Sequence, residues 1–406
     1  MNYLKFSLFV SLFFVLNLNA QTKTIGLQEI WGGAFRMQGM DVLHSMKNGQ
    51  QYSVLNFDRD AGATSIDIYD YKTLSKTKTL VSSANLKDLR YFSDYKFSSD
   101  ESKIILATNE EAIYRRSSLG HYYVYNISDS TATIISTDKI QEPTFSPDGT
   151  KVAYGLNNNL YVKDLQTEVT LQITADGEKN KVINGITDWV YEEELSFVRA
   201  FEWNKDSNQI AFLRFDETNV PEFSMDVYGT GLYQTQQVFK YPKAGEANSE
   251  VSLHIYHVND KLSKQVLVQK TYTDFYIPRI KWTNNADVLS AQFLNRKQNE
   301  LDLWMINSKT NKTNLVLTET DDAYVDVTDN LTFLKDNSFI WTSEKDGFNH
   351  IYHYDKKGAL INQVTKGNWE VTSYYGYDDK SGNIFYQSVE NGSINRDVYS
   401  VKLNGR

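Results

Sequence analysis

The chain has 406 residues and no cysteine, and its 51 acidic and 42 basic residues give a formal net charge of −9. The negative charge argues against a nucleic-acid surface, and the lack of cysteine excludes disulfides, thiolate zinc sites, iron–sulfur clusters and a cysteine nucleophile. Hydrophobic residues make up 41% and aromatic residues 14% of the chain, a composition typical of a folded globular protein that favours strands, because aromatic side chains suit half-buried pleated surfaces.

Residues 1–20 have the layout of a secretory signal peptide. Lys5 precedes an apolar run at 6–16, and small and polar residues then lead to Ala20. The run is too short to span a bilayer comfortably, with an uncleaved membrane anchor as the alternative. We therefore predict an exported chain, periplasmic, secreted or at the cell surface, that begins at Gln21 and has no membrane anchor after cleavage.

Two sequence phrases recur in a fixed order through the rest of the chain. The first is an aromatic residue, a polar turn and an alternating apolar strand, and it is clearest in Phe145–Tyr154. Its copies begin at Phe97, Phe145, Trp203, Trp282, Phe333 and Tyr377. The second phrase, such as Tyr122–Asn126 or Leu301–Ile306, alternates like a strand with one buried face. The Asp, Asn, Gly and Pro residues between strands supply turn chemistry.

A repeat of about 40–50 residues that carries several short strands is typical of a β-propeller blade. We predict an all-β fold, a β-propeller of about seven four-stranded blades in one domain over 21–406. The units are expected at 36–85, 86–138, 139–176, 183–270, 273–320, 325–367 and 369–404. The fourth unit is the longest, and its surplus at 220–248 should project from the blade. A solenoid or two β-sandwiches would not explain the fixed order of the phrases.

The common catalytic and metal-binding motifs are missing from the sequence. It has no Gly-x-Ser-x-Gly elbow, no glycine-rich phosphate loop and no His-Glu-x-x-His. The pairs His254/His257 and His350/His353 both read His-Ile-Tyr-His. Side chains three apart on a strand point to opposite faces, so neither pair can chelate one metal. We interpret the pairs as equivalent strands of two blades, and we expect no metal and no cofactor.

One stretch, Asp188-Trp-Val-Tyr-Glu-Glu-Glu194, does not read like a blade. Residues 188–195 could form a short helix, with Thr187 or Asp188 as its N-cap. Three consecutive glutamates are more often a solvated helix face than a binding site, so a functional interpretation depends on the sequence around them.

The same stretch resembles the double-glutamate signature of the dipeptidyl peptidase IV family, in the prolyl oligopeptidase group of serine peptidases. Phe215-Asp-Glu-Thr-Asn-Val-Pro221, Tyr241-Pro-Lys-Ala-Gly245 and Gly367-Asn-Trp-Glu-Val371 match that family in the same order. The resemblance implies an eight-bladed propeller stacked on an α/β-hydrolase domain. It also implies cleavage of dipeptides from free N-termini, with Pro or Ala preferred in the second position.

The resemblance assigns substrate contacts to three residues. Glu193 and Glu194 would hold the α-ammonium group of the peptide, and Arg115 would contact a peptide carbonyl near the scissile bond. Arg116 is the alternative, because two adjacent arginines leave the match ambiguous by one position; both could also be solvated charges of a blade edge. A bound ammonium would offset the repulsion between adjacent carboxylates and form charge-assisted hydrogen bonds with them.

The family places its serine, aspartate and histidine in the hydrolase domain, whereas this chain stops at Arg406, after the seventh unit. We therefore expect a fragment that lacks the eighth blade, has no catalytic residue and is inactive alone, with a missing or separately encoded hydrolase domain as its partner. Homodimerisation stays open. A non-catalytic exported propeller that binds peptides or a partner protein is the alternative. A propeller glycosidase is disfavoured, because adjacent carboxylates are poorly placed to flank a glycosidic bond.

Overall fold

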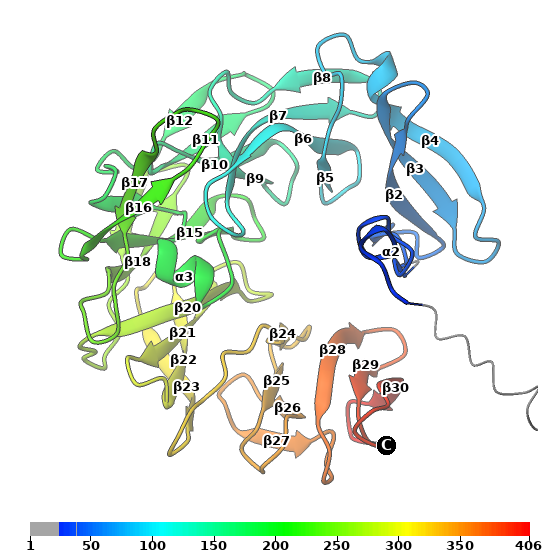
Figure 1. Ribbon diagram of the computed structural model, residues 1–406. Helices are drawn as coiled ribbons and strands as arrows, with labels where there is room; N and C mark the ends of the chain where they lie inside the picture. Colours follow the sequence, from blue (N-terminus) through cyan, green and yellow to red (C-terminus); the bar gives the residue numbers. More distant parts are fainter. Residues whose placement is uncertain (1–23, 38) are drawn as a thin grey trace, which may run out of the picture.

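The computed structural model describes residues 24–37 and 39–406, and the predicted signal peptide lies outside them. Antiparallel sheets follow one another around a ring in chain order (Figure 1). In blades 2 and 6 of Figure 1, the first strand lies toward the centre and the last toward the rim. The sheets correspond to the seven units expected from the sequence, which confirms the propeller prediction.

Blades 1 to 3 each contain four strands paired in chain order. Their strands are β1 (Leu43–Ser45), β2 (Gln51–Asp58), β3 (Ala63–Asp70), β4 (Lys76–Ser82), β5 (Asp94–Phe97), β6 (Lys103–Ala112), β7 (Ser118–Asn126), β8 (Thr131–Ile134), β9 (Gln141–Phe145), β10 (Lys151–Leu156), β11 (Asn159–Asp164) and β12 (Thr170–Gln172). Helix α2 (Leu27–Trp31) precedes them, and the short 3₁₀ helix η1 (Ser83–Asn85) follows β4.

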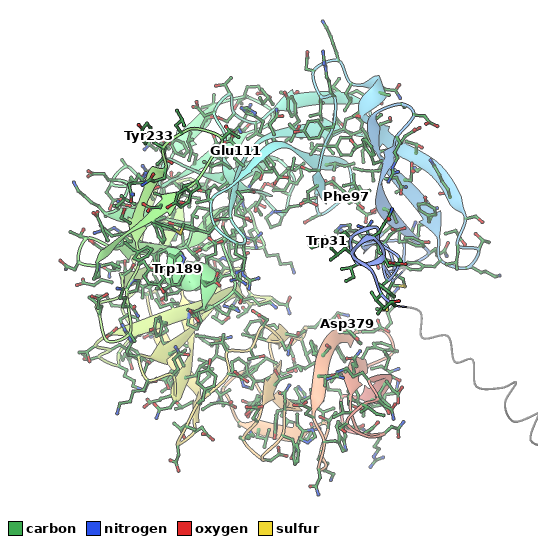
Figure 2. The ribbon with its side chains drawn as sticks, in the orientation of Figure 1. Trp31, Phe97, Glu111, Trp189, Tyr233 and Asp379 are labelled. Atoms are coloured by element: carbon green, nitrogen blue, oxygen red, sulfur yellow. The ribbon has the colours of Figure 1, made fainter. Side chains whose placement is uncertain are left out.

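Blade 4 has an interrupted first strand, because β13 and β14 both pair with β15 and flank the helix α3. Its elements are β13 (Val182–Asn184), α3 (Trp189–Glu193), β14 (Phe201–Trp203), β15 (Gln209–Asp216), β18 (Glu250–His257) and β19 (Leu262–Gln265). Between β15 and β18 the chain forms a separate hairpin of β16 (Glu222–Val227) and β17 (Thr235–Lys240). This hairpin lies within the surplus expected at 220–248, and Figure 2 labels Tyr233 on its connecting loop.

Blades 5 and 6 have four strands each, and blade 7 has three. Their strands are β20 (Phe275–Trp282), β21 (Val288–Asn295), β22 (Glu300–Asn307), β23 (Thr313–Thr320), β24 (Thr332–Phe333), β25 (Phe339–Ser343), β26 (His350–Tyr354), β27 (Leu360–Gln363), β28 (Val371–Asp378), β29 (Asn383–Ser388) and β30 (Asp397–Lys402). Among the described residues, no helix is long and apolar enough to cross a membrane.

The first sequence phrase forms the hairpin between the first two strands of a blade. In blade 3, β9 ends at Phe145 and β10 begins at Lys151. In the turn between them the Ser146 hydroxyl donates to Asp148 at 2.6 Å, and Gly149 has φ 68°, in the left-handed region that glycine adopts without strain. Each phrase therefore encodes its turn locally, which explains why the blades could be counted from the sequence.

The second phrase forms the third strand of a blade. His254 lies on β18 and His350 on β26, the third strands of blades 4 and 6, as the repeat interpretation predicted. His350 is fully buried, between the Thr365 hydroxyl and the Gly367 carbonyl. Over the described part of the chain, no group of three or more His, Asp or Glu side chains is arranged to hold a metal.

The largest hydrophobic core joins blades 4, 5 and 6, and it includes Val190 and Tyr191 of α3. Burial of an aromatic side chain of this kind stabilises a fold by about 1.5–3 kcal/mol. The short helix is thus part of the core, which fixes the position of the residues that follow it.

Candidate functional site

Helix α3 begins where the sequence predicted. Asp188 is its N-cap, and its Oδ1 accepts a hydrogen bond from the Tyr191 amide at 2.9 Å. The other carboxylate oxygen accepts from the Ser249 hydroxyl. Burial raises the pKa of Asp188 above its ordinary value, although these two hydrogen bonds oppose the shift. The helix ends after Glu193, and Ser196 then turns the chain with φ 62°.

The aromatic residues of α3 hold it against the other family-like motifs. The Tyr191 hydroxyl accepts from the Ile277 amide at 2.9 Å, and its ring packs edge-on against Phe215, with 4.7 Å between centroids. Trp189 packs edge-on against Tyr241 at 4.4 Å, and Figure 2 labels Trp189 on the helix. Both aromatic side chains therefore pack the motif against the rest of the blade.

The last turn of α3 brings together the three residues assigned to substrate contact. Arg115, which follows β6 of blade 2, forms an ion pair with Glu193 at 2.8 Å. The Arg115 side chain is 71% exposed and the Glu193 side chain 24%. Glu194 is exposed, and over residues 24–37 and 39–406 its carboxylate makes no hydrogen bond or ion pair. One carboxylate is thus held by a cation, and its neighbour is free to take one.

Arg116, the alternative to Arg115, has a different position. Its guanidinium donates to the Glu192 carbonyl oxygen at 3.2 Å and to the Ser196 hydroxyl at 3.1 Å. Arg116 therefore ties the blade 2 segment to the backbone at the end of α3. The geometry favours Arg115 over Arg116 as the arginine beside the carboxylates, and its contact with substrate stays a prediction.

Glu192 was overlooked by the sequence reasoning, although it belongs to the same glutamate run. It is 2% exposed, and its Oε1 accepts from the backbone amides of Arg116 at 2.7 Å and Ser117 at 2.8 Å. A carboxylate that accepts two backbone N–H groups holds that backbone firmly. Glu192 thus fixes the segment that carries Arg115 next to Glu193. Its position one turn after Asp188 on the buried side of α3 is the signal that could have revealed it.

The opposite side of the helix end is held by blade 5. Arg279 on β20 donates to the Leu195 carbonyl oxygen at 2.9 Å, and its guanidinium lies 5.1 Å from the centre of the Phe197 ring. Arg279 also pairs with Asp329, at 3.0 Å between Nη2 and Oδ2. Asp329 lines a pocket of about 650 Å³ between blades 5, 6 and 7, so the end of α3 connects directly to the edge of that pocket.

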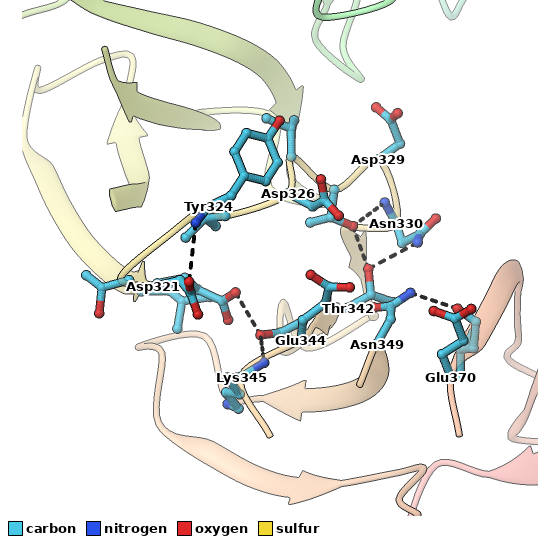
Figure 3. A pocket seen from close by; sticks show the side chains of 18 of the residues that line it. Asp321, Tyr324, Asp326, Asp329, Asn330, Thr342, Glu344, Lys345, Asn349 and Glu370 are labelled. Carbon is cyan, nitrogen blue, oxygen red and sulfur yellow. Dashed lines mark hydrogen bonds between the residues drawn. The ribbon is translucent and has the colours of Figure 1, made fainter. Parts of the chain in front are cut away.

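This pocket is strongly acidic. Figure 3 shows Asp321, Asp326, Glu344 and Glu370 around it. Burial and the carboxylates of Asp326, Glu370 and Asp321 raise the pKa of Glu344 above its ordinary value. Burial, with the Asp326 and Glu194 carboxylates, also raises the pKa of Tyr324. The carboxylates that line this pocket therefore make this part of the propeller favourable for cations.

Comparison with known proteins gives a family for the chain. Residues 98–406 match the family model described as "Dipeptidyl peptidase IV (DPP IV) N-terminal region". A dipeptidyl peptidase 4 from Trichophyton tonsurans is 30% identical over 341 residues, which cover 80% of this chain and 43% of that protein. The inactive dipeptidyl peptidase 10 of Rattus norvegicus is 25% identical over 418 residues, covering 95% of this chain and 50% of that one.

A solved structure agrees with these sequence matches. The crystal structure of Porphyromonas gingivalis dipeptidyl peptidase 4 superposes with a TM-score of 0.89 at 39% identity, covering 95% of this chain and 55% of that one. The chain spans about half the length of the relatives it matches. With its sequence motifs, its seven blades and its double-glutamate helix, the chain belongs to the dipeptidyl peptidase IV family, as part of that family's N-terminal propeller region.

Proposed function

We propose that this propeller binds the free N-terminus of a peptide, as the recognition part of an exported serine-type dipeptidyl peptidase that releases X-Pro or X-Ala dipeptides. The observation that carries the proposal is the carboxylate pair at the end of α3, with Glu193 held by Arg115 and Glu194 without a partner among the described residues. In this proposal Glu193 and Glu194 bind the α-ammonium group, and Arg115 contacts a peptide carbonyl.

The chemistry of the helix end supports these roles. An α-ammonium group has three N–H donors, and a hydrogen bond to a charged group contributes about 1.5–3 kcal/mol. Arg115 already holds Glu193 in place, so less side-chain entropy is lost on binding. The acidic pocket between blades 5, 6 and 7 adds an attraction for cations near Glu194.

In this proposal the carboxylate pair also sets the length of the released product. If the ammonium must lie on Glu193 and Glu194, the distance from them to a nucleophile fixes how many residues are released. The proposal assigns bond cleavage to the serine, aspartate and histidine of an α/β-hydrolase domain, and it expects none from these 406 residues alone. A purified sample that releases chromophore from a Gly-Pro-anilide substrate would contradict this part.

Peptide titration followed by NMR tests the recognition role. A short peptide with a free N-terminus and Pro in second position should bind, and its N-acetylated form should not. Glu194→Gln should weaken binding by about 1.5–3 kcal/mol. Glu390→Gln, an exposed change on blade 7, is the matched control and should leave binding unchanged. Equal binding of the acetylated peptide would refute the ammonium role.

A non-catalytic peptide-binding propeller is the second candidate, because one relative carries the name inactive dipeptidyl peptidase 10. The DNA downstream of codon 406 separates the two candidates. Codons for a Gly-x-Ser-x-Gly elbow support the peptidase, and an unrelated neighbouring gene supports the binding module. Export is tested separately, since N-terminal sequencing of the protein from cells should begin at Gln21.

A further inference from the structure

A second pocket lies beside α3, on the side that carries Asp188 and Glu192. Its volume is about 540 Å³, and it is enclosed by segments of blades 2, 3 and 4 and by β17 of the projecting hairpin. A volume of this size suits a small molecule. The residues assigned to peptide recognition, Glu193, Glu194 and Arg115, do not line it.

Two polar side chains of this pocket, Glu217 and Ser117, have no hydrogen-bond partner among the described residues. Glu217 is 6% exposed, and among the described residues its carboxylate makes no hydrogen bond or ion pair. Ser117 is 4% exposed, and its hydroxyl also lacks a hydrogen-bond partner in that part of the chain. Buried polar groups are normally satisfied, so each unsatisfied one requires an explanation. The Glu217 carboxylate and the Ser117 hydroxyl line the same cavity, so a hydrogen-bonding ligand placed there would supply the missing partners.

The neighbouring carboxylates do not share this property. Glu192 accepts from two backbone amides, and Asp188 accepts from the Tyr191 amide and the Ser249 hydroxyl. Lys240 lines the pocket, yet its ammonium donates to the carbonyl oxygens of Val220 at 2.8 Å and Thr218 at 3.4 Å. Among the buried carboxylates that line this pocket, Glu217 is therefore the one that lacks a donor in the described part of the chain.

The charge around Glu217 defines which ligand would fit. The charged and titratable groups facing it or lining the same pocket are Asp188, Glu192, Tyr114, Asp216, Lys240, Glu178 and Lys179. Burial, followed by the Asp188 carboxylate, raises the pKa of Glu217 to about 7, and Lys240 opposes the shift. An added cation would favour the ionised form, because it offsets both burial and the Asp188 charge.

Aromatic rings complete the lining. Tyr114 and Phe239 pack with 5.7 Å between ring centroids, and Trp189 lines the same pocket. Aromatic faces attract ammonium groups and also accept apolar groups. We propose that this pocket binds a small primary amine in its ammonium form, with the ammonium on Glu217 and the Ser117 hydroxyl and the apolar body against Tyr114 and Phe239. This site does not depend on the peptide role of Glu193 and Glu194.

Calorimetric titration of the whole chain with 2-phenylethylamine at pH 8 tests the proposal. Glu217→Gln should weaken binding at least tenfold, on the scale of one lost hydrogen bond to a charged group, and Ser117→Ala should weaken it by a smaller factor. The same comparison is repeated in a Glu193→Gln/Glu194→Gln background, which removes amine bound at the proposed α-ammonium site, and Glu217→Gln should weaken binding by the same factor there. The neutral analogue 2-phenylethanol should bind much more weakly.

The pH dependence gives an independent measurement. Since the pKa of Glu217 is about 7, the ionised fraction and the affinity should both fall about tenfold between pH 8 and pH 6. The folded state of each variant is checked by its circular dichroism melt, and glutamine can fill the site of Glu217 as a neutral side chain of the same shape. Binding that survives Glu217→Gln in the Glu193→Gln/Glu194→Gln background, binding lost in the Glu193/Glu194 double variant, or no binding by wild type would each overturn the proposal.

Discussion

Glu192 in the last turn of α3 and Glu194 at its C-cap lie two residues apart and carry the same functional group, yet their surroundings are opposite. Glu192 is 2% exposed and accepts two backbone hydrogen bonds from blade 2. Glu194 is exposed and has no partner among the described residues. The difference shows that burial and available donors, not residue type, separate a carboxylate that holds the fold from one that is free to bind a ligand.

Glu217 adds a third case, a carboxylate that is buried as deeply as Asp188 but has no donor in the described part of the chain. Such a group costs stability when it is ionised, because burial disfavours the charge. The three glutamates therefore make different predictions for stability and for ligand binding.

The largest expected effect is on Glu192. Glu192→Ala should lower the free energy of unfolding by about 3 kcal/mol, because it leaves the buried Ser117 amide and the partly buried Arg116 amide without this acceptor. Urea denaturation followed by tryptophan fluorescence measures the loss. Glu192→Gln keeps one acceptor oxygen and should cost less. If Glu192→Ala lowers the free energy of unfolding by less than about 0.5 kcal/mol, Glu192 has no larger structural role than the exposed Glu194.

Glu217→Gln should instead raise the free energy of unfolding, and only at higher pH. The folded chain binds the Glu217 proton more tightly than the unfolded chain, with a pKa of about 7 against an ordinary 4.5. Wild-type stability should therefore fall relative to Glu217→Gln as the pH rises from about 4.5 to about 7. At pH 8 the variant should be more stable by on the order of 3 kcal/mol.

Urea denaturation at pH 4.5, 6 and 8 measures the Glu217 difference. Glu390→Gln, at an exposed position on blade 7, serves as the control and should show no such pH-dependent gain. If the difference in the free energy of unfolding between wild type and Glu217→Gln stays constant across this pH range, the pKa of Glu217 is not raised in the folded chain.

The adjacent residues Arg115 and Arg116 of blade 2 should differ in the same way, one in ligand binding and the other in stability. Arg116→Ala should cost about 1 kcal/mol of stability, because its guanidinium hydrogen bonds to Glu192 and Ser196 are lost. Arg115→Ala should change stability by less than about 0.5 kcal/mol, since its ion pair is exposed, and it should instead weaken peptide binding. The reverse pattern in thermal melts and peptide titrations would exchange the roles of the two residues.

The smallest effect is expected at Glu194. Glu194→Ala should leave the free energy of unfolding within about 0.5 kcal/mol of wild type, because an exposed side chain without partners contributes little. A differential scanning melt beside Glu192→Ala makes the comparison direct. Equal destabilisation by the two variants would mean that Glu194 has a structural role.

Much of the fold was accessible from local sequence. The turn between Phe145 and Lys151 uses Ser146, Asp148 and Gly149, which lie within four positions of each other and can be read without knowing the rest of the chain. The start of α3 could also be predicted, because the Asp188 side chain accepts from the amide of Tyr191, only three residues further along the chain. The projecting hairpin followed from the excess length of one repeat.

The candidate site was only partly accessible. The family motif selected Glu193 and Glu194, but it left Arg115 and Arg116 unresolved, and it did not distinguish Glu192 from its neighbours. A pattern along one strand or helix carries no information about which side chain from another blade lies opposite. The blade 2 segment meets α3 across 76 residues of sequence, from Arg116 to Glu192.

The sequence by itself determined the repeat, the number of blades and the existence of a capped, glutamate-rich helix, because turns, strand alternation and caps depend on residues close together in the chain. The tertiary structure alone decided which arginine pairs with Glu193, why Glu192 is buried, and that Glu217 and Ser117 face one cavity. Those features depend on how blades 2 and 4 pack, and packing sets burial and local charge through residues that are far apart in the sequence.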